Sequence, residues 1–202
     1  MSRPLDSAAL KEELPAALGE FHRVADALMT TNSFLDRLEA CGIVTPEAAG
    51  RLGLVGPVAR ASGQDLDCRR DHRFGPYDKL EKHVSLRHRG DVLSRVQVML
   101  EEVEESARII SELIGAGLGS GVNEAASNPV PGVALGWCES CRGESLTWLA
   151  LDEAGRITRA RLRPSSVRNW RAFDDAARSR NVFTDIPIIE ASFWLTVAGF
   201  AC

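Results

Sequence analysis

The sequence predicts an α+β fold that is predominantly α, a helical bundle around one long central helix with a small β-hairpin region near the C-terminus. Apolar residues recur at helical spacing in the central part of the chain and again near its N-terminus. Further on, two short segments alternate between polar and apolar residues, as strands do. At 202 residues, with 45% hydrophobic and 26% charged side chains, the composition is that of an ordinary globular chain.

Apolar residues at helical steps from Leu5 to about Cys41 predict one long N-terminal helix. The Thr31-Asn32-Ser33 tripeptide offers a break or a new N-cap there, because hydroxyl and amide side chains can bind free backbone N–H groups. Thr45 followed by Pro46 predicts the start of a further short helix, since the missing N–H of proline costs little in the first turn. We expect that helix to end at Gly53.

Residues 54–80 carry many charges and show little periodicity, which predicts an irregular loop. Loops of this length are usually functional or disordered. A surface loop with weak salt bridges is one interpretation. We favour a buried network of arginines and aspartates, because Gly56, Pro57 and Gly63 fix a local backbone geometry that a mobile loop would not need.

The central helix is predicted to run from Gly90 to Leu113. Asp91 lies in its first turn, where the positive end of the helix dipole favours a carboxylate, and glycines from Gly115 to Gly119 mark its end. Steps of three, four and seven residues place its apolar side chains on one face, which we expect to be a core stripe. This stripe comprises Val92, Val96, Met99, Val103, Ile110 and Leu113.

Small residues from 119 to 132 predict a linker. It would separate a helical part, residues 1–118, from a small mixed α/β part, residues 133–202. In the second part, residues 145–151 and 157–163 alternate with a period of two around an Asp-Glu-Ala-Gly sequence. This pattern predicts a β-hairpin.

Charge and composition exclude some functions. The net charge of −4 argues against general nucleic-acid binding. No apolar run is long enough to span a bilayer and no secretory segment follows the N-terminus, so we expect a cytoplasmic location. The five cysteines of such a chain are expected to be reduced thiols.

Cys138 and Cys141 are the only cysteines that are spaced as a pair. One C-x-x-C cannot complete a tetrahedral zinc site by itself, and no histidine lies within about fifteen residues of it. A structural role is the simpler interpretation. The alternative is a dithiol that supplies half of a metal site, with the other half coming from elsewhere in the chain or from a partner.

Glu139 and Glu144 flank Arg142 in the same segment. The planar guanidinium can hold either carboxylate through two hydrogen bonds, and Gly143 permits a tight turn into the hairpin. A carboxylate buried beside an arginine can handle protons, because burial and pairing move its pKa in opposite directions. An architectural contact explains the pattern equally well. Glu139, Arg142 and Glu144 are therefore candidate catalytic residues, with both interpretations open.

Ordered blocks of residues along the chain carry a family resemblance. The blocks are Gly56-Pro57 with Arg60-Ala61-Ser62-Gly63, then Asp67, Arg69 and Tyr77-Asp78, then Gly90-Asp91-Val92 with Arg95 and Glu102, and last Glu139, Arg142, Gly143 and Glu144. They resemble the large subunits of respiratory complex I, of the forty-nine-kilodalton type, and of membrane-bound, energy-conserving nickel–iron hydrogenases. The resemblance covers nearly the whole chain. It looks closest to the hydrogenase-4-like branch, whose ending resembles Ser192-Phe193 followed by Ala198-Gly199.

The resemblance implies that this chain is the C-terminal portion, or a split form, of such a large subunit and lacks a complete nickel site. It would be an oxidoreductase subunit of NADH dehydrogenase or hydrogenase type in a membrane-associated electron-transfer complex, not active alone. The alternative is a non-catalytic scaffold or assembly protein derived from that subunit. An exposed apolar face would favour a subunit that needs a partner, and a closed monomer would favour the scaffold.

The same resemblance implies partners on the inner face of the cell membrane, to which the chain would bind peripherally. These would be a small iron–sulfur subunit and membrane-arm subunits, with a separate chain for the N-terminal half as a further option. By this resemblance, the iron–sulfur cluster, quinone and NAD would belong to partner subunits. For NAD the sequence agrees, since no glycine-rich nucleotide fingerprint follows a strand here.

No cofactor is expected on this chain alone, and nickel least of all. True hydrogenases of the family bind nickel through two C-x-x-C pairs. The first pair is missing here, and Cys202 at the end has no paired cysteine. Cys138 and Cys141 lie in a block where the family has no nickel ligands.

By resemblance, one group of charged residues would order a loop beside the cavity of the complex, a second would brace the central helix, and a third would link the hairpin to that helix. The groups are Arg60, Asp67 and Arg69, then Asp91 and Arg95, then Glu139, Arg142 and Glu144. The structural ion-pair network that we predict comprises Arg60, Asp67, Arg69, Asp91, Arg95 and Glu102.

Overall fold

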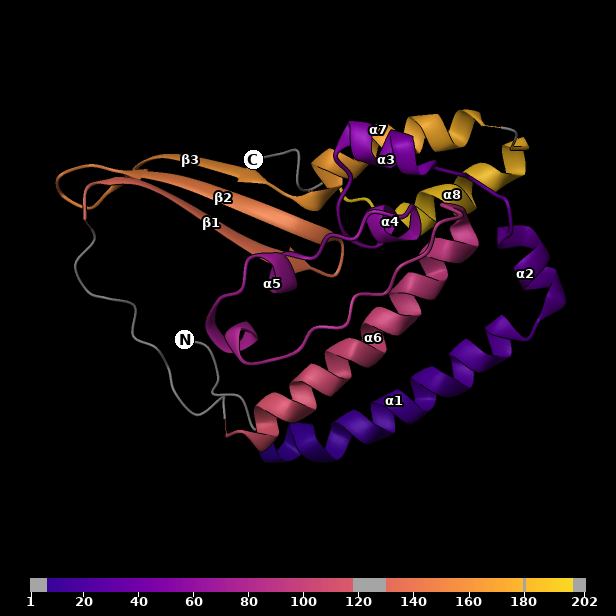
Figure 1. Cartoon of the computed structure of the whole chain (residues 1–202), viewed down its shortest axis with the longest axis horizontal. Coiled ribbons are helices and arrows are strands. Elements are labelled where there is room, and N and C mark those ends of the chain that lie inside the picture. Colours follow the sequence, from indigo (N-terminus) through magenta and orange to yellow (C-terminus); the bar gives the residue numbers. More distant parts are fainter. Residues whose placement is uncertain (1–6, 118–129, 180, 198–202) are drawn as a thin grey trace.

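The computed structural model of the chain describes residues 7–117, 130–179 and 181–197. Two long antiparallel helices, α1 and α6, lie side by side, and a three-stranded sheet projects from a group of shorter helices (Figure 1). The elements are α1 (Ser7–Met29), α2 (Asn32–Leu38), α3 (Pro46–Leu52), α4 (Gly56–Ala61), α5 (Cys68–Asp71), η1 (Gly75–Asp78), α6 (Val92–Gly115), β1 (Gly132–Ser140), β2 (Gly143–Leu151), β3 (Ile157–Arg163), α7 (Ser165–Arg178), η2 (Phe183–Asp185) and α8 (Ile186–Phe193). The predicted fold class, α+β and predominantly α, is confirmed.

The N-terminal segment forms two helices, so the prediction of one helix to Cys41 is wrong and the predicted break is confirmed. The backbone of Thr31 is extended between α1 and α2, and its hydroxyl donates back to the carbonyl oxygen of Ala27 at 2.6 Å. No described residue of α1 is buried. The apolar side of α1 leans on α6 and leaves much of itself uncovered.

The helix predicted to start at Thr45 is confirmed as α3. The Thr45 hydroxyl accepts a hydrogen bond from the Ala48 backbone N–H at 3.2 Å, Pro46 occupies the first turn, and Gly53 ends the helix with φ +63°. Local capping chemistry is sufficient to define both ends of this element.

The charged segment 54–80 was predicted to be an irregular loop. This prediction is wrong in part, because the segment contains α4, α5 and η1. Pro57 lies in the first turn of α4, and the Asp67 carboxylate caps α5 by accepting from the Arg69 N–H at 3.0 Å. Helices of four to six residues are too short to show a hydrophobic period. Their capping residues were the only signal in the sequence.

The central helix is α6, and its predicted start is confirmed. One oxygen of Asp91 accepts from the backbone N–H and the hydroxyl of Ser94, at 2.8 and 2.6 Å. The predicted core stripe is correct for the buried Val92 and wrong for Val103, which is 38% exposed. Val98, Ala107 and Ile109, on a neighbouring face, are buried instead. Val96 also packs against the core, whereas Met99, Val103 and Ile110 line a cavity that the chain leaves open.

The hydrophobic core lies where α2, α3, α4, α7 and α8 surround the first turns of α6. The core residues are Leu38, Cys41, Val44, Ala49, Leu54, Val58, Ala59, Val92, Ala172, Ala176, Ile189 and Phe193. The lower half of α6 and most of the sheet extend beyond it (Figure 1).

The sheet is antiparallel with strand order β1-β2-β3. The predicted hairpin is confirmed as β2 and β3, and β1, which pairs Glu139 with Glu144, was not predicted. Most of the predicted linker 119–132 lies outside the described residues. The division of the chain into two parts at that linker stays a prediction.

Two glycines join the sheet to the helical part. A Cβ atom on Gly56 would lie 2.4 Å from the carbonyl oxygen of Arg142, and one on Gly143 would lie 2.6 Å from the nitrogen of Gly56. Both have positive φ, +68° and +119°. The turn between β1 and β2 thus packs directly on the start of α4, and this contact brings the end of β1 beside α4 and α5.

Within the described ranges, no helix combines the length and the apolar character that crossing a bilayer requires.

Candidate functional site

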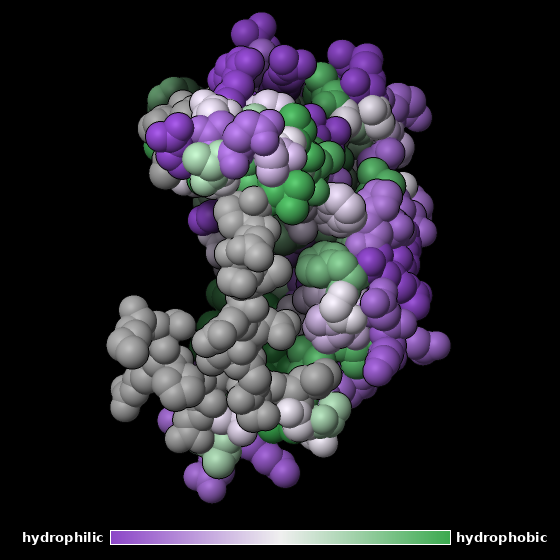
Figure 2. Space-filling model, turned by 90° about the vertical axis from the view of Figure 1, so that its left-hand side faces the viewer, coloured by the Kyte–Doolittle hydropathy of each residue, from purple (hydrophilic) through white to green (hydrophobic). Residues whose placement is uncertain are grey.

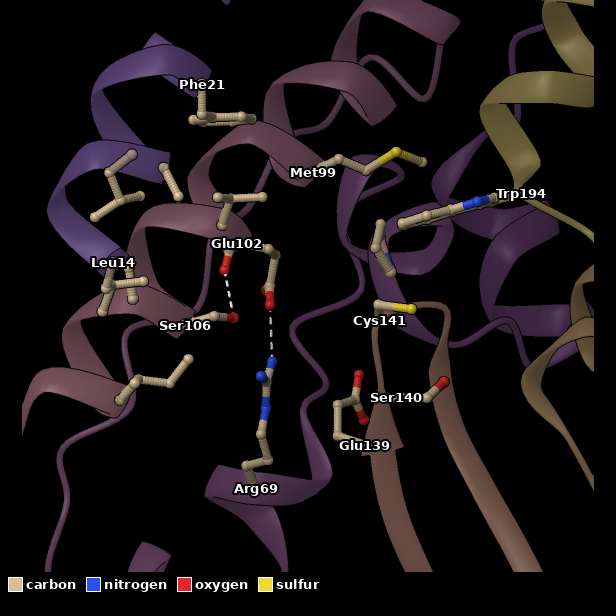
Figure 3. A pocket seen from close by; sticks show the side chains of 16 residues that line it. Leu14, Phe21, Arg69, Met99, Glu102, Ser106, Glu139, Ser140, Cys141 and Trp194 are labelled. Atoms are coloured by element: carbon tan, nitrogen blue, oxygen red, sulfur yellow. Dashed lines mark hydrogen bonds and ion pairs between the residues drawn. The ribbon is translucent and has the colours of Figure 1, made fainter. Parts of the chain in front are cut away.

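An open cavity of about 480 Å³ lies between α1, α6 and the end of β1 (Figure 3). Apolar side chains of the two long helices form most of its wall, and Arg69, Glu102 and Glu139 lie at its polar side. Figure 2 shows hydrophobic residues in the recess beneath the hydrophilic tip of the sheet. The apolar lining residues include Leu14, Leu18, Phe21, Met99, Val103, Ile110 and Trp194.

Six charged residues from five regions of the chain form what we call the buried charge cluster. It comprises Arg60, Asp67, Arg69, Lys82, Glu102 and Glu139. Three of these side chains are basic and three acidic, and the buried Glu105 lies 3.9 Å from Lys82 Nζ at the edge of the cluster. Each charge has an oppositely charged neighbour, because an unpaired buried charge would be very costly.

Arg60 of α4 lies at the centre of the buried charge cluster, with a side chain that is 1% exposed. Its Nη1 donates to Glu139 Oε1 at 3.0 Å and to the carbonyl oxygen of Leu66 at 2.9 Å. Its Nε lies 3.2 Å from Glu102 Oε1, although these two atoms are not aligned as a hydrogen bond. One guanidinium therefore ties α6, the α5 region and β1 together.

Arg69 binds Asp67 through two parallel hydrogen bonds, of 2.9 and 2.6 Å, and also donates to Glu102 Oε2 at 2.8 Å. Burial by itself would raise the pKa of Asp67. The hydrogen bonds from Arg69 and the positive charges of Arg69, Arg60 and Lys82 outweigh burial and hold the pKa of this carboxyl below its ordinary value.

Lys82 is a member of the buried charge cluster that the sequence did not reveal. Its ammonium lies 3.9 Å from Asp67 Oδ2 and 3.8 Å from Glu102 Oε2, and it donates to the carbonyl oxygen of His83 at 2.6 Å. Desolvation lowers the pKa of this amine, with the neighbouring Arg69 acting in the same direction. Nothing in its local sequence distinguishes it from an exposed lysine.

Glu139 lies at the end of β1, with a side chain that is 2% exposed. One carboxylate oxygen accepts from Arg60, and the other accepts a long hydrogen bond, 3.4 Å, from the Cys68 backbone N–H. Burial raises the pKa of Glu139 and the charge of Asp67 adds to this effect, while Arg60 opposes it. Its pKa is therefore shifted in the opposite direction to that of Asp67, its neighbour.

Asp91 and Arg95 do not join the buried charge cluster, since both lie near the start of α6. Arg95 is fully buried and donates to Ser192 Oγ at 2.9 Å and to the carbonyl oxygens of Gly90 and Gly42 at 2.8 and 3.0 Å. Its guanidinium also lies over the ring of Phe193, 4.5 Å from the centroid. Four of the six residues of the predicted ion-pair network, Arg60, Asp67, Arg69 and Glu102, lie together.

Arg142 pairs with neither flanking carboxylate, contrary to the predicted bidentate contact. Glu139 binds Arg60, and Glu144 binds Arg168 at 3.0 Å. The reason is strand geometry: Glu139 and Glu144 are cross-strand partners whose side chains share one face, while Arg142 lies in the turn. Its guanidinium lies over the ring of Trp194, 5.3 Å from the centroid.

Cys138 and Cys141 are exposed free thiols. Within the part of the chain that the structure describes, no three His, Cys, Asp or Glu side chains gather in a way that could hold a metal ion. Two thiols fall short of the four ligands of a tetrahedral zinc site. Among the described residues, Cys138 and Cys141 therefore lack the further ligands that a metal centre needs.

The chain is similar in sequence to a family of respiratory-chain subunits. Residues 7–128 match the family model described as respiratory-chain NADH dehydrogenase, 49 kDa subunit. The chain belongs to this family, and the resemblance read from the sequence is confirmed.

Three relatives show the range of this similarity. An NADH-quinone oxidoreductase subunit of Roseiflexus sp. is 31% identical, over 91% of this chain and 51% of the relative. Formate hydrogenlyase subunit 5 of Escherichia coli is 30% identical, over 86% of this chain and 30% of the relative. The carbon monoxide-induced hydrogenase of Rhodospirillum rubrum is 30% identical, over 79% of this chain and 44% of the relative. The chain thus spans about half or less of the length of these relatives.

A solved structure shows the same fold. A chain of the membrane-bound sulfane sulfur reductase, an archaeal respiratory membrane complex, matches with a TM-score of 0.75 at 24% identity. The match covers 93% of this chain and 51% of that chain.

Proposed function

We propose that this chain is the C-terminal part, or a split form, of the large subunit of a membrane-associated electron-transfer complex of NADH:quinone or hydrogenase type. It acts as an oxidoreductase subunit and is not active alone. The observation that carries the proposal is the open apolar cavity with the buried charge cluster at its polar side, in a chain of this family.

The uncovered apolar surface supports a subunit that needs a partner. Leu14, Leu18 and Phe21 of α1 face Met99 and Val103 of α6 across the cavity, and no described residue of α1 is buried. Apolar surface left open in this way marks a protein–protein or ligand surface. The partner that we propose is a small iron–sulfur subunit that closes the cavity, with membrane-arm subunits beyond it on the inner face of the membrane.

The resemblance alone assigned quinone to partner subunits, but the apolar cavity leads us to propose a quinone-type acceptor for the space that this chain and its partner enclose together. Apolar side chains such as Leu18, Met99 and Ile110 offer surface to a ring and its tail, and Arg69 and Ser140 are polar groups at the other side. Such a ligand, when bound, accepts electrons and protons. In this proposal the iron–sulfur cluster and NAD belong to partner subunits.

The test is purification of the tagged chain from its native host in mild detergent, with identification of co-purifying chains and analysis of nickel, iron and zinc. An iron–sulfur chain and membrane chains without nickel would support the quinone-type assignment. Nickel with an iron–sulfur partner would support the hydrogenase type, with ligands supplied by another chain. Recovery of the chain without redox partners would overturn the proposal and favour a scaffold or assembly protein.

A matched pair of variants tests the docking surface. Val103 is 38% exposed and lines the cavity, while Val24 is 44% exposed on α1 and does not line it. We expect Val103→Asp to abolish co-purification of the iron–sulfur chain and Val24→Asp to retain it. Equal retention by both variants would show that the partner binds elsewhere.

A further inference from the structure

A second, small cavity of about 80 Å³ lies beside the buried charge cluster. Polar groups line much of it, including Asp67, Asp71, His72 and Glu144. A polar space of this size can hold water, because the groups around it offer several hydrogen-bond partners. It differs in this respect from the main cavity, whose wall is mostly apolar.

Of the described residues, Glu139 alone lines both cavities. In Figure 3 its carboxyl group points into the space between Arg69 and Ser140. Its two oxygens have different partners: one accepts from Arg60 at 3.0 Å and the other from the Cys68 backbone N–H at 3.4 Å, and the Cys68 thiol also forms a hydrogen bond with this carboxyl group. The second oxygen is the one that can take up and release a proton without breaking the contact with Arg60.

We propose that Glu139 carries protons between the small polar cavity and the main cavity. The inference rests on the proposed function, in which a quinone-type acceptor is reduced in the main cavity. For each electron that a partner's iron–sulfur cluster delivers, one acceptor oxygen gains one proton. The O–H bond of protonated Glu139 breaks as the new O–H bond forms, and a proton from bulk solvent, relayed through water in the small cavity, then restores the carboxylic acid.

The charges around Glu139 suit this role. Arg60 of α4 faces it directly, Asp67 and Cys68 face it from the start of α5, and Glu102 contributes from α6 through Arg60. Burial raises the pKa of Glu139 and the charge of Asp67 adds to this, outweighing the opposing effects of Arg60 and of the hydrogen bond from Cys68, so the protonated form is favoured relative to an ordinary glutamate. The remaining charged groups at the small cavity are Asp71, His72, Glu144 and Arg168.

The first experiment does not depend on enzymatic activity. Infrared titration of the full-length chain is expected to show one protonated carboxyl signal that persists above the ordinary range of glutamate. This signal should shift in D₂O, because the small cavity admits water, and it should vanish in Glu139→Gln. Glu153→Gln, which changes an exposed turn residue, serves as control and should retain it. Absence of the signal, or its failure to exchange, would overturn the proposal.

The second experiment uses the intact complex and a short-chain, water-soluble quinone as probe. Glu139→Gln is expected to lower the turnover about a hundredfold with little change in KM, as loss of a general acid does. Glu139→Asp keeps a carboxylate opposite Arg60 and serves as the control for a folding defect. We expect this variant to retain activity with a shifted pH profile. A Glu139→Gln complex with the rate and pH profile of the wild type would refute proton transfer through this residue.

The two experiments separate the two proposals. If the wild-type complex does not reduce the quinone, the proposed function fails and the infrared titration alone decides whether Glu139 exchanges protons between the cavities. If the quinone is reduced and Glu139→Gln is without effect, the function stands and this inference falls.

Discussion

The two halves of α6 bury arginines in opposite ways. Near its start, Arg95 is surrounded by two carbonyl oxygens, a serine hydroxyl and the ring of Phe193. Further along, Glu102 joins Arg60 and Arg69, whose charges are balanced by carboxylates at the side of an open cavity. The first arrangement is sealed inside the core, and the second lies beside an open apolar cavity.

In our proposal, this difference separates a structural site from a functional one. Neutral acceptors hold Arg95 in one geometry, and none of them changes charge with pH. The carboxylates of the buried charge cluster can take up protons, and their pKa values are shifted in opposite directions at Asp67 and Glu139. A subunit that handles protons needs the second arrangement, and it needs the first to keep the helix in place.

The largest expected effect concerns the sealed half. Arg95→Ala removes the donor for three buried acceptors and leaves a void, so we expect the free energy of unfolding to fall by about 3–5 kcal/mol. Denaturant unfolding of the purified chain measures this. The control is Arg178→Ala at the end of α7, where the ion pair with Asp174 is exposed on both sides (78% and 61%) and should be worth less than about 1 kcal/mol. Similar losses in the two variants would contradict the comparison.

A second prediction tests how the sheet is held against the helical part. Gly56→Ala places a methyl group against the backbone of the β1–β2 turn, so we expect a loss of about 2–4 kcal/mol and a displaced β1. Gly75 is a matched control, because it also precedes proline, has φ +57° and has open space around its Cβ position. Gly75→Ala should cost only about 1–2 kcal/mol of backbone strain. If both variants unfold alike, the close contact is not what holds the sheet.

The sequence predicted those elements whose signals are local. Capping side chains predicted two helix starts, Thr45 at α3 and Asp91 at α6, and the Asp-Glu-Ala-Gly sequence predicted the turn of the hairpin. The structure confirms all three. Strand β1 was missed because small residues, Gly132, Ala134 and Gly136, alternate with its large ones and resemble a linker. Its position is determined by pairing with β2, which a local pattern does not record.

The candidate site was predictable only in part, because its contacts join distant segments. Arg60 forms a hydrogen bond with Glu139, which lies 79 positions further along the chain. Lys82, which precedes α6, lies 3.8 Å from Glu102 on that helix. From the sequence, Arg142 was expected to bind the neighbouring Glu139 or Glu144. In the structure, strand geometry directs Glu139 to Arg60 and Glu144 to Arg168. The family resemblance identified the important blocks without saying which residue of one block touches which residue of another.

The smallest expected effect is the pH dependence of the buried charge cluster. Asp67 has a pKa below its ordinary value of 3.8, so its contribution to stability is fully present above that value and is lost as the pH falls through the folded-state pKa. The difference in unfolding free energy between wild type and Asp67→Asn should therefore be largest near neutral pH and shrink in acid. Denaturant unfolding over a pH series measures it, with Asp174→Asn as an exposed control. A difference that stays constant down to strongly acidic pH would mean that the Asp67 carboxylate does not stabilise the cluster through its charge, and the contrast between the two halves of α6 would then rest on packing alone.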